Sequence, residues 1–445
     1  MKTLKLLTIT LLIVSLISPG TLFAQEGSSS YSLEQAKDFA IKNSITIKNA
    51  NLDVDLAKAE IRKAGVAGLP GVRASLGYQN FIDIPTQVVP ANAFDPSAQD
   101  DLLIPLKFGT DHNVFAKVYV NQLIFSASYF VGLQASRVYK GLSESNLRRT
   151  ELDIKDMVSQ SYYTALVAME NKKIITQSLE NLKKILAESK VLNENGFIEE
   201  LEYEQLMLTV TEMENMSNTA EGRVQMTLNM LKFQMGVDVG SAIILSDGLE
   251  SILGEVDNEL TGTPALDLNG HVNYRIILTQ QKLQELSLRN ERLSLLPTVT
   301  GFFTHSQNGF ANEIKFDPYY PTTIWGINLT VPIRWTSPNS KKAKLELQKI
   351  QNSKIELEQG LKMEVMSTSI SYDNARAQYF SEKQNIDLAK KILDKTLIKY
   401  REGMVSSMEV TQANNQYLST QGKYFNSIFE LLSTKNRLDK ALNNN

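Results

Sequence analysis

Two glycines, each standing inside a long helical stretch, constrain the fold of this chain more than any other feature. Gly196 interrupts the stretch from about 142 to 235, and Gly403 interrupts the stretch from about 338 to 442. Around both glycines, apolar residues recur at spacings of three and four, which is the helical period. Glycine adopts the left-handed conformation that ends a helix at no steric cost, so a helix that stops there and restarts at once forms a hairpin. The sequence therefore predicts two helical hairpins with outgoing arms about 80 and 95 Å long.

The two hairpins carry the same polar residues at the same places. Glu202 and Glu409 both lie six positions after their glycine, and Gln205 and Gln412 both lie nine positions after it. Upstream, each half has a helical stretch that ends at a Leu-Pro pair. Two stretches in which apolar and polar residues alternate follow it. Proline cannot continue a helix, so both pairs mark the same kind of junction. We therefore predict an internal duplication in the order helix, strand, loop, strand, very long helix, glycine tip and returning helix.

Two of the helical stretches have features that define their limits. Residues 31–64 have helical spacing and open on Ser32 and Gln35, which fit a capping box. Residues 338–402 form the second outgoing arm, and Gly360 is the only break expected in it. Both stretches are predicted as helices.

Four stretches of alternating apolar and polar residues predict strands. We expect them at about 71–82, 113–125, 298–306 and 322–333, with a loop rich in proline and aspartate between the first two. Strands of about ten residues that are apolar on one face and polar on the other are typical of transmembrane β-strands. A half-buried hairpin in a soluble sheet is the alternative.

These landmarks divide the chain into four parts. Residues 1–24 have a basic start, an apolar run and a break before Ala24, which predicts a secretory signal peptide. The first repeat covers 25–235 and the second covers 265–445. Between them, residues 236–264 are rich in glycine and lack a helical period, so they are predicted to be a linker, or equatorial segment, with local structure at the midpoint of the chain.

Composition excludes several classes of function. The formal net charge is −3, from 46 basic and 49 acidic residues, which leaves no basic field for nucleic acid. The absence of cysteine excludes disulfides and thiolate metal sites. The three histidines have no partners close in sequence, and neither a phosphate-binding loop nor a nucleophile motif occurs. We therefore expect no enzyme activity, no metal site and no cofactor.

The duplicated order resembles the TolC-like family of outer-membrane efflux proteins over about 31–442. The residues that carry the resemblance are Gly68-Leu69-Pro70, Leu295-Leu296-Pro297, Asn121-Gln122-Leu123-Ile124-Phe125, Thr330-Val331-Pro332-Ile333, and Tyr400 and Gly403 followed by Glu409-Val410. The resemblance implies a mainly α fold with membrane β-structure. Three chains would assemble, so that the hairpins form a periplasmic α-barrel and each chain gives four strands to a twelve-stranded β-barrel. Four strands cannot close a barrel alone, so partner copies are required.

The resemblance also implies a function and partners. The chain would be the outer-membrane channel-tunnel of a tripartite efflux or type I secretion system in a Gram-negative type of envelope. Its partners would be two further copies of itself, outer-membrane lipid, a periplasmic adaptor protein and an inner-membrane pump of the RND, ABC or MFS class. The pump would select the cargo, and the tunnel would conduct it passively. An exported coiled-coil scaffold without a pore is the alternative.

The resemblance points to a periplasmic gate beside the second tip. Three Glu409 side chains would converge around the axis, with Gln412 nearby and Glu202 at the matching place on the first hairpin. Tyr400 would hydrogen-bond between neighbouring helices and help to keep the mouth shut. The alternative is that Glu409 is one more solvated acid. Some family members have an arginine two residues after the tip glycine that helps to lock the closed end; this chain has Val405 there, and Arg401 before the turn.

Two further sets of residues are predicted to form contact surfaces. The hairpin tips would contact the adaptor, although their glycines also simply turn the chain; these residues are Gly196, Phe197, Gly403, Met404, Val405 and Ser406. Aromatic residues at the strand ends would lie at the membrane interfaces, with ordinary core packing as the alternative; they are Tyr78, Phe81, Phe125, Trp325 and Trp335.

Overall fold

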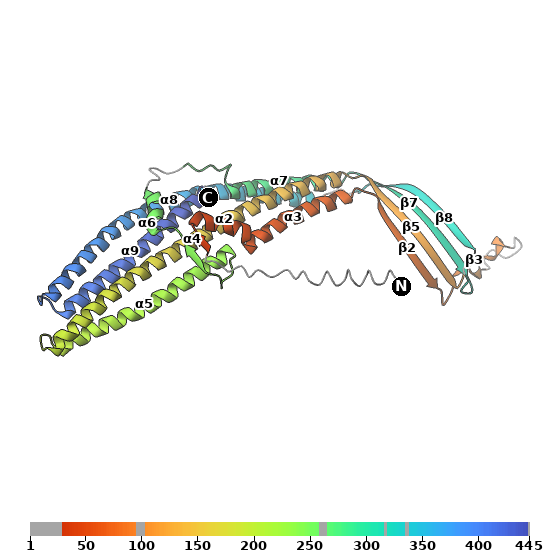
Figure 1. Cartoon of the computed structure of the whole chain (residues 1–445). Helices are drawn as coiled ribbons and strands as arrows, with labels where there is room; N and C mark the ends of the chain where they lie inside the picture. Colours follow the sequence, from red (N-terminus) through yellow and green to blue (C-terminus); the bar gives the residue numbers. More distant parts are fainter. Residues whose placement is uncertain (1–28, 95–102, 258–264, 316–317, 334–337, 444–445) are drawn as a thin grey trace, which may run out of the picture.

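The protein is an elongated molecule with a β-sheet at one end and two helical hairpin tips at the other (Figure 1). The computed structural model describes residues 29–94, 103–257, 265–315, 318–333 and 338–443. The predicted signal peptide lies outside the described residues. The N-terminal part of the described chain and the C-terminal end of the last helix both lie near the middle of the molecule.

The same order of long elements occurs twice. In the first half these are α2 (Leu33–Asn43), α3 (Ile45–Val66), β2 (Gly71–Asn80), β5 (His112–Phe125), α4 (Ala127–Glu194) and α5 (Glu200–Met235). In the second half they are α7 (Val272–Leu293), β7 (Thr298–Ala311), β8 (Tyr319–Thr330), α8 (Pro338–Arg401) and α9 (Ser407–Ala441). The short elements are β1 (Ser29–Tyr31), β3 (Thr86–Pro90), β4 (Leu103–Lys107), β6 (Ile243–Leu245), α6 (Leu249–Asp257) and a 3-10 turn at Ala91–Ala93.

The first outgoing arm is longer than the sequence predicts, and the second has the predicted length but is more continuous. Helix α4 has 68 residues and α8 has 64, or about 102 and 96 Å. Helix α4 already begins at Ala127, where the Ser126 side chain accepts a hydrogen bond from the backbone N–H of Tyr129. Helix α8 passes through Gly360 without interruption, so the expected break there is wrong. A single glycine in a helix interior costs only about 1 kcal/mol, which packing against neighbouring helices offsets.

The helix expected over 31–64 is divided in two. The capping box of Ser32 and Gln35 is confirmed at the start of α2. The chain then becomes extended at Ser44, with φ −55° and ψ 132°, and α3 begins at the next residue. The end of α5 lies against this break, because a Cβ atom on Gly236 would lie 3.0 Å from the carbonyl oxygen of Asn43. The division therefore comes from a tertiary contact that periodicity does not reveal.

The long strands form one antiparallel sheet in the order β2-β5-β7-β8. The central pair, β5 and β7, joins the two halves of the chain, and β2 and β8 are the two edges. The predicted loop between β2 and β5 contains its own antiparallel hairpin of β3 and β4. Strand β7 extends to Ala311, beyond the expected end near 306, because it pairs along the whole length of β5.

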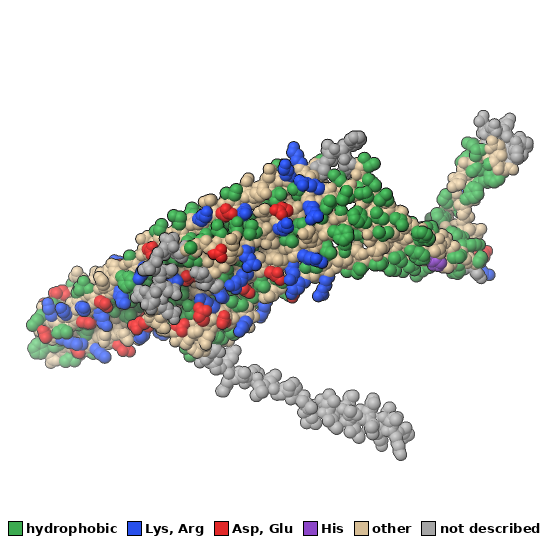
Figure 2. Space-filling model, turned by 90° about the horizontal axis from the view of Figure 1, so that it is seen from above, with side chains coloured by type: hydrophobic (Ala, Val, Ile, Leu, Met, Phe, Trp, Pro, Cys, Tyr) green, Lys and Arg blue, Asp and Glu red, His purple; other side chains and the backbone are tan. Residues whose placement is uncertain are grey.

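The register of the sheet collects apolar side chains on one face. Val72, Val120, Phe303 and Trp325 lie side by side across all four strands. Further members of this apolar face are Ala74, Leu76, Tyr78, Val114, Ala116, Val118, Ile327 and Leu329. Most of these side chains are exposed within one protomer; Leu76, for example, is 84% exposed. The same face also carries the polar residues Gln122, His305, Gln307 and Thr323, and the His305 ring contacts the Thr323 hydroxyl at 2.7 Å. In the view of Figure 2, hydrophobic side chains dominate the sheet end, whereas charged ones are intermixed over the helices.

The opposite face of the sheet is mostly polar, although Phe310, Tyr320 and Ile324 also lie on it. It carries Arg73, Ser75, Gln79, Asn113, Lys117, Tyr119, Asn121, Thr304, Ser306, Asn308, Thr322 and Asn328. Two aromatic rings on this face lie over glycines of the neighbouring strand, Phe115 over Gly77 and Phe302 over Gly326. The sheet thus presents one apolar and one hydrophilic surface, the pattern of a strand wall between lipid and water.

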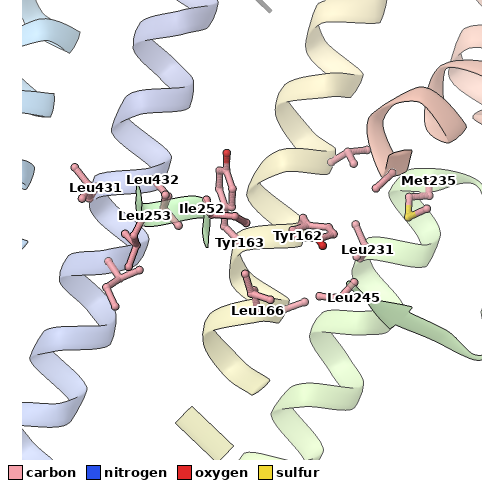
Figure 3. Packing of buried hydrophobic residues seen from close by; sticks show 14 of the residues in the cluster. Tyr162, Tyr163, Leu166, Leu231, Met235, Leu245, Ile252, Leu253, Leu431 and Leu432 are labelled. Atoms are coloured by element: carbon pink, nitrogen blue, oxygen red, sulfur yellow. The ribbon is translucent and has the colours of Figure 1, made fainter. Parts of the chain in front are cut away.

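A hydrophobic core at the equator joins both hairpins. Figure 3 shows Tyr162, Tyr163 and Leu166 of α4 between side chains of α5 and β6 on one side and of α6 and α9 on the other. The Tyr162 hydroxyl lies 3.0 Å from the carbonyl oxygen of Tyr31 and 3.1 Å from the Asp247 carboxylate. Burial is the main reason that the pKa of Tyr162 is raised far above its ordinary value. The predicted linker therefore contains ordered structure, because β6 pairs in parallel with β1.

A polar network also joins α4 to α9 near the equator. The Lys440 ammonium lies 2.9 Å from Asp153 and 3.1 Å from Asp156, and the Asn436 amide donates to Asp156. Burial lowers the pKa of Lys440, but hydrogen bonds to both carboxylates raise it above its ordinary value. Two connections, one apolar and one polar, therefore fix the two hairpins relative to each other.

Among the described residues, no helix has a stretch that is long and apolar enough to cross a lipid bilayer.

The end of α5 offers a test of the contact between the two halves of the first repeat. Gly236 has φ +75° and touches the Asn43–Ser44 backbone, so Gly236→Ala should lower the free energy of unfolding by about 1–2 kcal/mol. Gly360→Ala is the matched control, since no atom lies within 4 Å of the added Cβ, and it should stabilise by up to about 1 kcal/mol. Thermal unfolding of the purified protein in detergent measures both changes. Equal shifts of the midpoint in the same direction would show that the close approach at Gly236 does not constrain the fold.

Candidate functional site

The tips of the two hairpins have the same turn geometry. Gly196 has φ +77° and Gly403 has φ +70°. After each glycine, the next residue returns a hydrogen bond to the helix: Phe197 N–H donates to Leu192, and Met404 N–H donates to Lys399. This six-to-one bond is the Schellman motif, which needs a residue with positive φ and so favours glycine. The predicted role of both glycines in turning the chain is therefore confirmed.

All four long helices share a hydrophobic core behind these tips. Its buried members are Ile175, Leu182, Ile185, Leu206, Val210, Met213, Ala220, Tyr400 and Val410. Val405 is half-buried and packs against this cluster. At the position where some family members have an arginine, this chain therefore has a side chain that packs into the tip core.

Polar contacts connect the two hairpins at the same level. The Tyr400 hydroxyl of α8 and the buried Ser189 hydroxyl of α4 lie 2.9 Å apart. Beside this contact, the guanidinium of Arg401, which follows Tyr400 on α8, lies 3.2 Å from the carboxylate of Glu188, which precedes Ser189 on α4. The hydrogen bond between helices expected of Tyr400 is thus present, and the arginine before the turn has an acidic partner. Whether these contacts hold a mouth shut stays a prediction.

The returning helices, α5 and α9, are also joined near the tips. The Ser407 hydroxyl donates to the Gln205 side-chain oxygen at 3.1 Å, and the hydroxyls of Thr209 and Thr411 lie 3.0 Å apart. Sequence reasoning named Gln205 as part of the repeat but assigned no role to the residues that it meets. A periodic sequence does not reveal which face of one hairpin meets the other.

The predicted gate residues lie in different surroundings. Glu409 and Gln412 are one turn apart on α9, and both are exposed in the protomer. Glu202 is half-buried in the first turn of α5, and Tyr400 is buried in the tip core. The structure therefore brings Tyr400 into the contact between hairpins and leaves Glu409 and Gln412 on a surface that this protomer does not cover.

The predicted adaptor surface is apolar at its outermost points. Phe197 and Met404, which directly follow the two tip glycines, are 78% and 69% exposed. Ser406 is half-buried and is the N-cap residue of α9, without a side-chain capping bond. The repeat therefore places one large exposed apolar side chain on each tip.

The predicted interface aromatics lie at different levels of the sheet. Tyr78 and Phe81 are at its outer end, and the Tyr78 hydroxyl lies 2.9 Å from the ring of His112. Phe125 is at the end next to the helices, where its ring packs near Phe130. Trp325 is 77% exposed and belongs to the apolar face. Trp335 lies outside the described residues.

The contact between Tyr400 and Ser189 can be measured with a double-mutant cycle. Tyr400→Phe leaves the buried Ser189 hydroxyl without its partner, so it should lower the free energy of unfolding by about 1–3 kcal/mol. The double variant with Ser189→Ala should recover part of that loss, because both polar groups are then removed. The thermal midpoint in detergent reports each variant. Strictly additive effects would show that the two hydroxyls are not coupled.

No protein-family model and no curated protein sequence matches this chain. Solved structures match it over nearly its whole length. The outer membrane protein VceC of Vibrio cholerae has a TM-score of 0.68 at 13% identity, over 92% of this chain and 95% of its own. The CmeC outer membrane channel of Campylobacter jejuni has a TM-score of 0.63 at 19% identity, over 92% of this chain and 85% of its own. The open state of the MtrE outer membrane channel of Neisseria gonorrhoeae has a TM-score of 0.68 at 13% identity, over 92% of this chain and 88% of its own. The chain therefore has the fold of the TolC-like outer-membrane channels, as the duplicated order of its elements predicts.

Proposed function

We propose that three copies of this chain form an outer-membrane channel that conducts solutes passively out of the periplasm. The observation that carries the proposal is the four-stranded sheet, which has two open edges, one apolar face and one polar face. Closing such a sheet with copies of itself removes the unpaired edges and puts the apolar face in lipid and the polar face around water. The likeness of the fold to outer membrane channels supports the same function.

The directions of the two edge strands also determine how one copy can contact the next. Strands β2 and β8 are antiparallel to their own neighbours, and a sheet of four strands has edges that run in opposite directions. Strand β8 of one copy can therefore pair with β2 of the next in an antiparallel way, whatever the number of copies. Such an interface joins two different surfaces and is repeated around a ring. Three copies give twelve strands, an even number that encloses a water-filled bore.

The helices have matching unpaired surfaces. Exposed apolar residues on α5 are Leu201, Met207, Leu208, Met216, Met226, Met230 and Phe233. Exposed apolar residues on α8 are Leu345, Ile355, Met363, Met366, Ile370, Leu388, Ile392 and Ile398. Within the protomer α5 packs against α4 and α8 packs against α7 and α9, so these stripes remain uncovered. Contact between α5 of one copy and α8 of the next would bury both and continue the ring from the barrel into a periplasmic tunnel.

The hairpin tips would form the periplasmic end of this tunnel. The exposed Phe197 and Met404 are suited to contact a periplasmic adaptor, which would connect the tunnel to an inner-membrane pump of a tripartite or type I system. The uncovered face of α9 would bring three Glu409 side chains together at the mouth. Neighbouring carboxylates repel one another and attract cations, as acidic rings in pores do.

A scaffold without a pore is the competing function, and channel recordings separate the two. We expect the purified protein to be a trimer that gives discrete conductance steps in planar bilayers. Glu409→Gln should lower the preference for cations and the block by divalent cations from the periplasmic side by at least about twofold, since a nearby unit charge changes local ion concentration by that order. Glu402→Gln, on the α8 side of the same turn, is the control and should change neither.

These measurements test the channel and the role of Glu409 separately. A monodisperse monomer that retains β-structure, or a trimer without conductance, would contradict the proposal that the protein is a channel. A conducting trimer whose cation preference is unchanged by Glu409→Gln would keep the channel but remove Glu409 from its constriction.

A further inference from the structure

The polar face of the sheet carries charge of one sign only. Arg73 on β2 and Lys117 on β5 are the only lysine, arginine, aspartate or glutamate residues in the four strands of the sheet. Both belong to the polar face, and both are exposed. No carboxylate of the described residues forms an ion pair with either side chain. A chain with a net charge of −3 therefore has a wall segment that is purely positive.

The register brings the two positive charges together. Arg73 lies directly opposite Tyr119, and Lys117 is two residues before Tyr119 on the same strand and face. Arg73 and Lys117 are thus diagonal neighbours, with Cβ atoms about 7–8 Å apart. The Lys117 ammonium lies 5.9 Å from the centre of the Tyr119 ring. Two like charges at this separation repel each other, and an anion between them relieves the repulsion.

The surroundings of the pair are hydrophilic. Lys117 lies across from Ser75 on β2 and from Ser306 on β7, whose own neighbour on β8 is Thr322. These hydroxyls can donate hydrogen bonds to an anion as well as accept them. Lys117 therefore stands in a row of small polar side chains, and Arg73 stands in the neighbouring row with Tyr119, Thr304 and Ile324.

We propose that Arg73 and Lys117 form an anion-binding ring in the lumen of the β-barrel. The inference rests on the proposed assembly, in which three copies place six positive charges around one bore. Rings of arginine and lysine favour anions in the same way that acidic rings favour cations. The ligands are small anions, or carboxylate and phosphate groups on a solute that passes through the barrel.

This ring is electrically independent of the acidic residues at the tips. Helix α4, at 68 residues, separates the sheet from the tips by about 102 Å. The Debye length is about 8 Å at physiological ionic strength, so charges at the two ends do not sense each other. The channel would have an acidic periplasmic mouth and a basic outer segment, and each can be altered without the other.

The ring is tested by ion selectivity in planar bilayers. In a KCl gradient, the double variant Arg73→Gln with Lys117→Gln should lower the ratio of chloride to potassium permeability by at least about twofold, because Coulomb attraction across about 8 Å of water enriches anions by that factor per charge. The variant should also lose block by inorganic phosphate added to the extracellular side. Charge reversal, Arg73→Glu with Lys117→Glu, should shift selectivity further in the same direction.

Controls distinguish this inference from the channel itself. Lys107→Gln removes one positive charge from β4, which is outside the four-stranded sheet, and should leave selectivity and phosphate block unchanged. Trimer content in detergent shows whether each variant still assembles. If the wild-type protein conducts but both glutamine and glutamate variants keep its selectivity and phosphate block, the ring does not exist although the channel does. If neither inorganic phosphate nor solutes with phosphate groups block the wild type, the ring as proposed is also wrong, because it would then bind none of its expected anions.

Discussion

The structure depends on one constraint. A four-stranded sheet with two open edges and two unlike faces cannot by itself pair its edge backbone groups or bury its apolar face. Its edges, β2 and β8, have unpaired backbone groups, and its apolar face exposes side chains such as Leu76 and Trp325. Water is a poor solvent for that face, and lipid cannot hydrogen-bond to those edges. Both problems disappear when copies of the chain close the sheet into a barrel. The apolar stripes on α5 and α8 lie on the same two flanks of the protomer, so one ring of contacts serves both halves of the molecule.

The duplication explains how one chain supplies both flanks. The first repeat provides β2 and α5, and the second provides β8 and α8, so neighbouring copies in the proposed ring would meet as unlike repeats. Within the chain the repeats already meet as β5 against β7 and as α4 against α9. Within one chain, a strand and a helix of the first repeat thus contact a strand and a helix of the second repeat. The proposed contact between copies requires the same arrangement. The equatorial core around Tyr162 and the network around Asp156 hold this internal junction in place.

Much of the fold could be predicted from the sequence, because its signals are local. The tip glycines, the Leu-Pro ends and the period-two strands each depend on a few neighbouring residues, and they fall where the structure has them. Features that depend on distant residues escaped prediction. The break at Ser44 lies against Gly236, β6 pairs with the distant β1, and Ser189 and Glu188 meet Tyr400 and Arg401 from another hairpin. The closeness of Arg73 and Lys117 on the polar face likewise follows from strand register, which alternation alone does not specify.

The central claim, that β8 of one copy pairs with β2 of the next, is tested most directly by cysteine cross-linking. The chain has no cysteine, so introduced pairs are unique. Ser75→Cys on β2 combined with a series of single cysteines along β8, among them Thr322→Cys, should give a covalent ladder that ends at the trimer for at least one register. Ser75→Cys alone should give no cross-link, because the interface joins unlike edges. Dimers from Ser75→Cys alone, or no linkage from any pair in assembled protein, would contradict the pairing of β8 with β2.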